Sequence, residues 1–258
     1  KRARADVSPE TLKEYFANLE KSINGVPPTN LFNYDETNMS DDPGRKRMLY
    51  KRGKKYPENI INHSKSSTCL MFCGSASGTL LPPYFIYKAE HMWDRWMDNG
   101  PKGEPCCAER CCITGSRYNR SKSGWMEVSI FTDWFNSTFL PHAIRLPGKK
   151  VLIGDNLSSH FTEEVLENCR QNNIAFICLP KNSTHITQPL DVSFFRPLKM
   201  AWRTVLLKWK TLNTREAGMK KDVFPQLLRD TLLKMNEAVE GAIKKTLLVV
   251  LKQQAFIH

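Results

Sequence analysis

Three aspartates in this sequence could act together on a metal ion. Asp155 ends the apolar stretch KKVLIGD, Asp35 ends the short stretch NLFNYDE, and Asp191 follows a loop at or just before a helix. Three carboxylates brought close together repel one another, so one must be protonated or a cation must neutralise them. Oxygen ligands suit Mg²⁺ or Mn²⁺. Two such ions about 3.5–4 Å apart can activate a water or a 3′-hydroxyl and stabilise the leaving oxygen of a phosphodiester.

An alternative explanation covers two of these acids, because Asp is common in turns and at helix caps and both Asp35 and Asp191 stand where such residues occur. The three acids act together only if the fold brings them together. The order of the elements around them therefore decides between the two interpretations.

The pattern of apolar residues predicts alternating strands and helices. We expect helices at 8–23, 129–140, 162–172 and from about 192, and strands at 30–36, 68–89 (two strands and a turn), 149–155 and 174–180. Ser8 and Thr162 are the expected N-caps. The late strand–helix–strand order predicts parallel pairing with a right-handed crossover. Because the carboxyl ends of parallel strands face a common crevice, Asp35 and Asp155 are expected to converge there.

The positive charge of the chain is concentrated in two stretches. The net charge is +12 with a pI of about 9.3, while residues 45–55 and 196–221 each carry a net charge of +7. Such stretches suit a nucleic-acid partner, because each neutralised phosphate releases counterions. A solvated basic face is the alternative, and 51–55 also fits a nuclear import signal, so we expect a nuclear protein. The candidate DNA-binding residues are Lys51, Arg52, Lys54, Lys55, Lys199 and Arg203.

The eight cysteines fall into two groups. Four lie in apolar runs, at 69, 73, 169 and 178, and are predicted to be small buried side chains in a reducing compartment. The other four form the stretch CCAERCC. Zinc is not expected at Cys106, Cys107, Cys111 and Cys112, because adjacent cysteines point in different directions and no second distant pair exists.

The apolar runs and the first residues of the chain indicate how it is organised into domains. No run approaches 18 apolar residues, so no transmembrane helix and no membrane partner are expected. The first residues lack the apolar core of a secretory signal, and the chain starts on Lys, which suggests a fragment of a longer protein. We predict an N-terminal helix and linker at 1–28, a catalytic domain at 29–210 with a loop-rich insertion at about 89–124, and a helical tail at 211–258.

Three blocks of sequence carry a family resemblance. NYDET (33–37), DNLSSH (155–160) and LPKNSTHITQPLDVSFFRPLK (179–199) together resemble the transposase domain of the pogo/Tigger/jerky group. That group belongs to the mariner-like DDE/DDD transposases and includes the centromere-binding protein B lineage. The resemblance covers roughly residues 8–210.

The resemblance implies an α/β, RNase H-like fold. We expect a mixed five-stranded sheet flanked by helices, with an insertion and a helical C-terminal tail. The family's three acids map to Asp35, Asp155 and Asp191, and 35 residues separate the last two. The implied activity is DNA cleavage and strand transfer with two divalent metals, Mg²⁺ or Mn²⁺, and no further small-molecule cofactor. The family's N-terminal helix-turn-helix region has no counterpart in this sequence, so sequence-specific DNA recognition is not expected of it.

Two residues after the second acid are candidates for a supporting role. Asn156 either orients Asp155 or starts a turn, and His160 either reaches a phosphate or a water near the metals or is structural. Two other functions remain open. One is a domesticated, non-catalytic DNA-binding or chromatin protein on the same fold. The other is an interaction module whose leucine-rich tail, 222–258, forms a homodimer.

Overall fold

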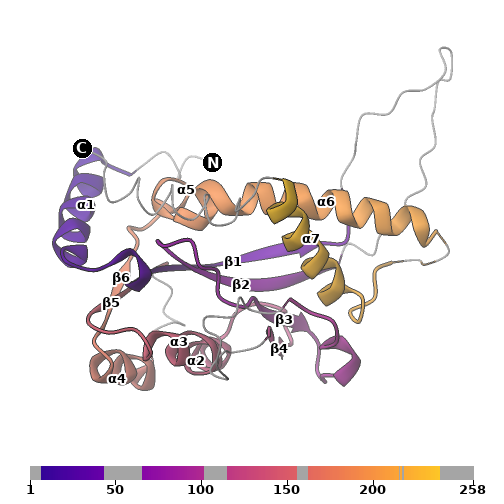
Figure 1. Ribbon diagram of the computed structural model, residues 1–258, viewed down its shortest axis with the longest axis horizontal. Helices are drawn as coiled ribbons and strands as arrows, with labels where there is room; N and C mark the ends of the chain where they lie inside the picture. Colours follow the sequence, from indigo (N-terminus) through magenta and orange to yellow (C-terminus); the bar gives the residue numbers. More distant parts are fainter. Residues whose placement is uncertain are drawn as a thin grey trace, which may run out of the picture.

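A mixed sheet lies between two layers of helices in the computed structural model, which describes residues 7–43, 66–101, 115–155, 162–214, 216 and 218–238 (Figure 1). The six strands of this sheet are β1 (Leu31–Ser40), β2 (Ser67–Ser75), β3 (Tyr84–Lys88), β4 (Arg117–Ser121), β5 (Lys150–Gly154) and β6 (Ile174–Cys178).

The strand order defines the class of fold. It reads β4-β3-β2-β1-β5-β6, with β1, β2 and β3 as an antiparallel meander. β5 and β6 run parallel to β1 and to each other, and β4 runs parallel to β3. A three-strand meander continued by two strands parallel to its first strand is the RNase H-like arrangement. The predicted fold class is therefore confirmed.

Helices cover both faces of the sheet. One face carries α2 (Val128–Trp134), the π-helical turn η4 (Phe135–Phe139), α3 (Leu140–Ala143) and α4 (Glu163–Gln171). The other face carries α1 (Pro9–Ile23), α5 (Thr184–Thr187), the π-helical turn η6 (Leu190–Phe194), α6 (Phe195–Leu212) and α7 (Phe224–Ala238). Short 3₁₀ turns, η2 (Pro28–Asn30) and η3 (Asp94–Trp96), complete the described elements.

The side chains of β1 alternate between these two layers, as the period of two in a strand requires. Phe32 and Tyr34 pack into the core under α2 and α4. Leu31 belongs to the opposite core beneath α1, and Asn33 contacts the segment before η6. Asp35 therefore points to the face that carries α5, η6 and α6. That direction brings it toward Asp191.

Local signals in the sequence account for the predicted helix starts. The hydroxyl of Ser8 accepts the backbone N–H of Thr11 at 3.2 Å, which caps α1 as expected. Thr162 caps α4 in the same way through Val165 N–H, also at 3.2 Å.

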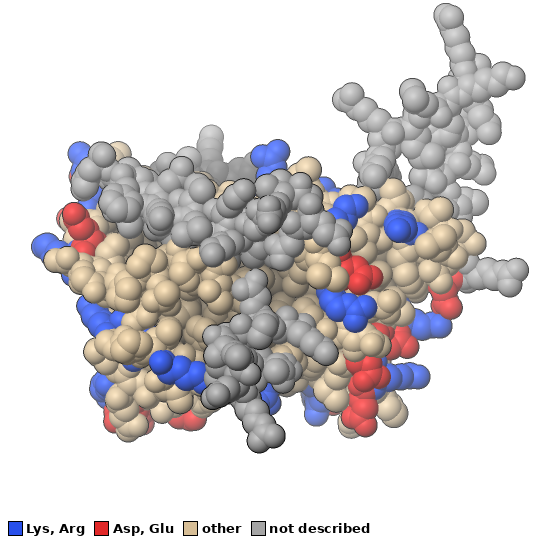
Figure 2. Space-filling model, viewed as in Figure 1, with Lys and Arg blue, Asp and Glu red and all other residues tan. Residues whose placement is uncertain are grey.

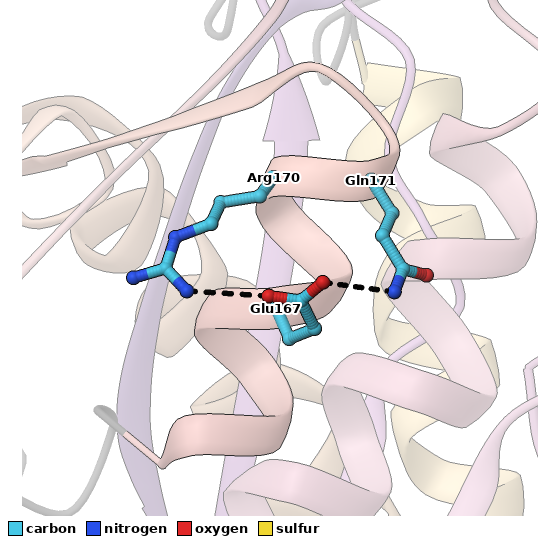
Figure 3. Close-up of polar contacts among 3 residues, drawn as sticks. All are labelled: Glu167, Arg170 and Gln171. Carbon is cyan, nitrogen blue, oxygen red and sulfur yellow. Dashed lines mark hydrogen bonds and ion pairs between the residues drawn. The ribbon is translucent and has the colours of Figure 1, made fainter.

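The exposed side of α4 carries a small polar network, which Figure 3 shows in close-up. Arg170 Nη1 lies 3.2 Å from Glu167 Oε2, and Gln171 Nε2 donates to Glu167 Oε1 at 3.0 Å. Such exposed pairs one helical turn apart stabilise a helix only slightly. Because α4 packs on the face opposite to Asp35, the network is a helix-stabilising feature and not part of the candidate site.

Two predictions about strands are wrong. The strand around NYDE does not end at Asp35, because β1 continues to Ser40 and pairs with β2 over its whole remaining length. The predicted insertion is not only loops, because β4 forms within it and makes the sheet six-stranded instead of five-stranded. The polar sequence RYNRS forms a strand because it is an edge strand, held by β3 on one side.

The remaining helices and strands agree with the sequence to within a few residues. The helix expected at 129–140 is the continuous run α2–η4–α3, and the long helix expected from 192 enters through η6 and becomes α6. Cys69, Cys73 and Cys169 are buried as predicted, and Cys178 is half-buried. The domain boundaries at 28 and 210 stay a prediction, although α7 shares a core with α6 and the sheet.

Candidate active site

The pairing of β1 with β5 directs the first two acids toward neighbouring positions. Leu31 pairs with Val151 and Asn33 pairs with Ile153 in a parallel register, and the ladder ends there. The same register continued by two residues would set Asp155 beside Asp35. Adjacent strands lie about 4.8 Å apart, and residues two apart point to the same face, so both carboxylates belong to the same side of the sheet. Both also stand where β5 ends, at the carboxyl edge at which α/β sheets bind ligands.

A close packing contact fixes the strand that leads to Asp155. A Cβ atom on Gly154 would lie 2.1 Å from Cε1 of Tyr34, a distance at which something must shift. The ring of Tyr34 has no room to move, because it is buried against Phe131 and Trp134. The sequence LIGD therefore needs glycine immediately before the acid, and this contact ties the end of β5 to β1.

The third acid lies on the same face of the sheet as the first. Asp191 lies in η6 and is exposed. Burial and, as a smaller cause, the negative charge of Asp191 together raise the pKa of Asp35 to about 8. Hydrogen bonds from the backbone N–H of Glu36 and from the side chain of Gln188 partly oppose the rise. The charge of Asp191 thus affects the pKa of Asp35, although 155 residues separate the two in the sequence.

The charge of Asp155 affects the pKa values of two neighbouring groups. Burial raises the pKa of the Cys178 thiol, and the carboxylate of Asp155 adds to this rise. Burial likewise raises the pKa of Tyr34, with smaller contributions from Cys178, Glu36, Asp155 and Asp35. The phenol of Tyr34 therefore lies within electrostatic reach of both strand acids.

These residues suit a hard divalent cation chemically. A carboxyl group whose pKa stands near 8 holds a proton at neutral pH, and a bound cation would replace that proton. Within the described ranges, however, no group of three or more His, Cys, Asp or Glu side chains is close enough to hold a metal ion. Asp155 is also the last described residue before 156–161. The donors fit Mg²⁺ or Mn²⁺, and ion binding would have to draw the carboxylates closer.

Several predicted residues lie outside the part of the chain that the structure describes. They are the supporting residues Asn156 and His160, the basic residues Lys51, Arg52, Lys54 and Lys55, and the four cysteines of CCAERCC. Their proposed roles stay predictions.

The two remaining DNA-binding candidates lie on one stripe of α6. Arg203 is exposed, and Lys199 is half-buried with its ammonium 5.8 Å from the centre of the Phe195 ring. Arg196 is exposed and was not among the candidates, although positions 196, 199 and 203 follow the three-to-four residue spacing of one helix face. The stripe begins about one turn after Asp191. In Figure 2, Lys and Arg side chains are visible mainly toward the right-hand end of the region where α6 runs, and no residue of the stripe is labelled there.

The motif STHITQPLD, which carries part of the family resemblance, has a structural basis in buried polar residues. Ser183, Thr187 and Gln188 are fully buried polar residues. The hydroxyl of Ser183 donates to Pro180 O and lies 2.7 Å from Thr187 Oγ1, and that hydroxyl donates back to Ser183 O. These bonds fold the turn that precedes Asp191. The signal available in the sequence was the group of uncharged polar residues, interrupted by Ile186, that comes shortly before Asp191.

The strand order and the helix layers define an RNase H-like fold, and comparison with known proteins identifies the family. The family described as DDE superfamily endonuclease matches residues 64–250, so the chain belongs to that family. The match includes Asp155 and Asp191 and begins after Asp35. The resemblance to pogo-type transposases is thereby confirmed.

Curated relatives are distant and much longer. The chain is 26% identical over 158 residues to "MFS-type transporter clz9" of Cochliobolus lunatus, covering 59% of this chain and 15% of that protein. It is 26% identical over 136 residues to "Pogo transposable element with KRAB domain" of Homo sapiens, covering 52% of this chain and 20% of the relative. The chain therefore spans a fifth or less of these relatives' length. None of the described helices is both long and apolar enough to span a membrane.

Solved structures of Mos1 transposase are also similar. A paired-end complex with the left transposon end has a TM-score of 0.49 at 12% identity, covering 93% of this chain and 63% of that one. The Mos1 catalytic domain has a TM-score of 0.43 at 10% identity, covering 98% of each chain. Other Mos1 paired-end complexes contain Mn or Mg. The fold assignment here rests on the strand order and the family match.

Proposed function

We propose that this chain is the catalytic domain of a transposase-type DNA endonuclease. It cleaves phosphodiesters, and the resulting 3′-hydroxyl end then attacks a phosphodiester of target DNA, which joins the two DNAs and displaces an oxygen of the target strand. The proposal is supported by the positions of Asp35, Asp155 and Asp191, which the β1–β5 register and the placement of η6 direct to one face of the sheet. The β1–β5 register supports the first pair, and the effect of Asp191 on the pKa of Asp35 supports the second. Membership of the DDE superfamily endonucleases supports the reaction class.

Each acid has a distinct part in this proposal. In it, Asp35 is the half-buried ligand on the sheet, Asp155 is the ligand at the end of β5, and Asp191 is the exposed ligand on η6. The divalent ions that they would hold supply an activated oxygen nucleophile and stabilise the leaving oxygen. Asp35 holds a proton at neutral pH without a cation, so metal binding releases that proton and becomes stronger as the pH rises.

The substrate follows from the charge beside the acids. Arg196, Lys199 and Arg203 form a basic stripe on α6 that begins about one turn after Asp191. A phosphate backbone lying along this stripe would be led to the acids, with most contacts independent of base sequence. DNA as the substrate is consistent with a nuclear location, which we propose together with it.

The direct test is cleavage of supercoiled plasmid in Mn²⁺ or Mg²⁺. Asp155→Asn is expected to abolish metal-dependent nicking while its unfolding transition stays cooperative, because Asn keeps the shape of Asp but not its charge. Asp94→Asn, which changes an exposed acid in η3, is the matched control and should nick like the original chain. Equal nicking by the Asp155→Asn variant would reject the metal role of that residue.

A non-catalytic DNA-binding protein on the same fold is the second candidate. One observation favours it: within the described residues the acids are not already assembled as a metal-binding group. This candidate predicts DNA binding that depends on salt but is the same with Mg²⁺ and with EDTA. It also predicts no nicking by the unaltered chain, so the plasmid assay separates the two functions.

A further inference from the structure

Two buried amide side chains connect the segments that carry the three acids. Asn33 lies on β1, two residues before Asp35, and Gln188 lies three residues before Asp191. Both side chains are fully buried, with no exposed surface. Burying an amide costs free energy unless its hydrogen bonds are made, so the partners of these two side chains matter.

Asn33 uses its amide to join three segments. Its Nδ2 donates to the backbone carbonyl of Ile153 on β5 at 3.0 Å and to Gln188 Oε1 at 2.6 Å. Its Oδ1 accepts the backbone N–H of Leu190 at 3.3 Å, immediately before Asp191. One side chain on β1 therefore holds both the end of β5 and the start of η6.

Gln188 completes the connection from the other side. Its Nε2 donates to the backbone carbonyl of Tyr34 at 3.0 Å, and its side chain also hydrogen-bonds the carboxyl group of Asp35. Both N–H groups of each amide thus have partners, and each amide oxygen accepts one hydrogen bond. Gln188 also remains part of its own turn, because its backbone N–H donates to Thr184 O at 3.0 Å.

We infer that Asn33 and Gln188 are positioning residues, which set where Asp191 stands relative to Asp35 and to the end of β5 that carries Asp155. The hydrogen bonds of Ser183 and Thr187 already shape the turn before Asp191, so this pair is not needed to fold the turn itself. Its bonds instead fix the turn to β1 and β5. Hydrogen bonds are directional, so two buried amides whose bonds are all made favour one position of the turn relative to the strands. Apolar side chains in the same places would allow several positions.

This inference rests on the proposed function, and metal binding tests it without requiring cleavage. Mn²⁺ is titrated into the chain and followed by calorimetry, and into Gln188→Met and Asn33→Leu, which keep approximate size but remove the hydrogen bonds. We expect at least tenfold weaker Mn²⁺ binding in both. The loss of Mn²⁺ affinity in the double variant should be smaller than the sum of the two single losses, because the two residues share one hydrogen bond.

Asn30 supplies the matched control. It is a buried amide just before β1, and its Nδ2 donates to Pro147 O at 2.7 Å and Lys149 O at 3.1 Å. It thus ties the start of β1 to the segment before β5, about 17 Å along the strand from Asp35. Asn30→Leu should lower the melting temperature about as much as Asn33→Leu and leave Mn²⁺ affinity unchanged.

Each outcome decides the inference. Unchanged Mn²⁺ affinity in a folded Gln188→Met variant overturns it, and so does an equal loss of affinity in Asn30→Leu. If Gln188→Met does not fold, Gln188→Asn replaces it, since the shorter amide cannot reach both partners and must weaken Mn²⁺ binding if the inference holds. An unaltered chain that binds no Mn²⁺ defeats the proposed function and this inference together. Mn²⁺ binding that Asp155→Asn removes but Gln188→Met preserves defeats the inference alone.

Discussion

Replacing Asp35 by Asn is expected to stabilise the metal-free protein and to remove its response to metal. The pKa of Asp35 is raised to about 8 in the folded protein, chiefly by burial and then by the charge of Asp191, from an ordinary value of 3.8. The folded state therefore binds more protons than the unfolded state between these two pH values. Its free energy of unfolding falls as the pH rises through that window.

The size of the effect follows from the same values. The folded state loses about 1.4 kcal/mol of stability for each pH unit above 3.8 while Asp35 is still protonated in the fold. This amounts to about 4 kcal/mol at pH 7. Asn has no charge to bury, and its oxygen can still accept the hydrogen bond from Gln188. The Asp35→Asn variant should therefore exceed the original chain by about 4 kcal/mol at pH 7 and by about zero at pH 4.

Urea denaturation in EDTA at pH 4, 5, 6 and 7 measures this difference. With a slope of about 2.5 kcal/mol per molar urea, the midpoint should rise by about 1.5 M at pH 7. Glu90→Gln, at an exposed carboxylate, is the control and should leave the midpoint unchanged. Mn²⁺ at a hundred times its dissociation constant should then stabilise the original chain by about 2.7 kcal/mol and leave Asp35→Asn unaffected.

The reasoning is refuted if Asp35→Asn is no more stable than the original chain at pH 7, or if its advantage is the same at pH 4. Either result would mean that burial and Asp191 do not disfavour the ionised carboxylate. If Mn²⁺ stabilises Asp35→Asn as much as the original chain, Asp35 does not bind the metal.

Two further predictions concern the basic stripe and the end of β5. Changing Lys199 and Arg203 to Gln should weaken binding of duplex DNA and lower the slope of log affinity against log salt by about one for each residue. Lys122→Gln is the control and should leave the slope unchanged. Equal slopes in a filter-binding titration of the variant and the original chain would show that the DNA does not contact these two residues. Gly154→Ala should lower the free energy of unfolding by about 3 kcal/mol, because the new methyl group meets the buried ring of Tyr34; an unchanged urea midpoint would show that the ring can move.

Much of the fold could be predicted because local patterns carried it. β5 and β6 are short apolar runs on either side of a helix whose cap, Thr162, is visible in the sequence. Asp155 and Asp191 could be singled out because one ends such a run and the other precedes an amphipathic helix. A parallel arrangement then predicted that the acids would approach one another.

Other features depend on contacts that no local pattern reveals. The end of β1 was predicted too early because DETNMS is largely polar, whereas Thr37 and Met39 are buried in the fold and pairing with β2 extends the strand to Ser40. β4 was missed because an edge strand needs no apolar alternation. The contact between Asn33 and Gln188 joins residues 155 positions apart, so only the tertiary fold shows it.

Anomalous diffraction from a crystal grown with Mn²⁺ would show whether the three carboxylates share bound cations. We expect Mn²⁺ peaks between the carboxylates of Asp35, Asp155 and Asp191, and their disappearance in crystals of Asp35→Ala. Mn²⁺ bound elsewhere while these three carboxylates remain apart would rule out the shared metal site.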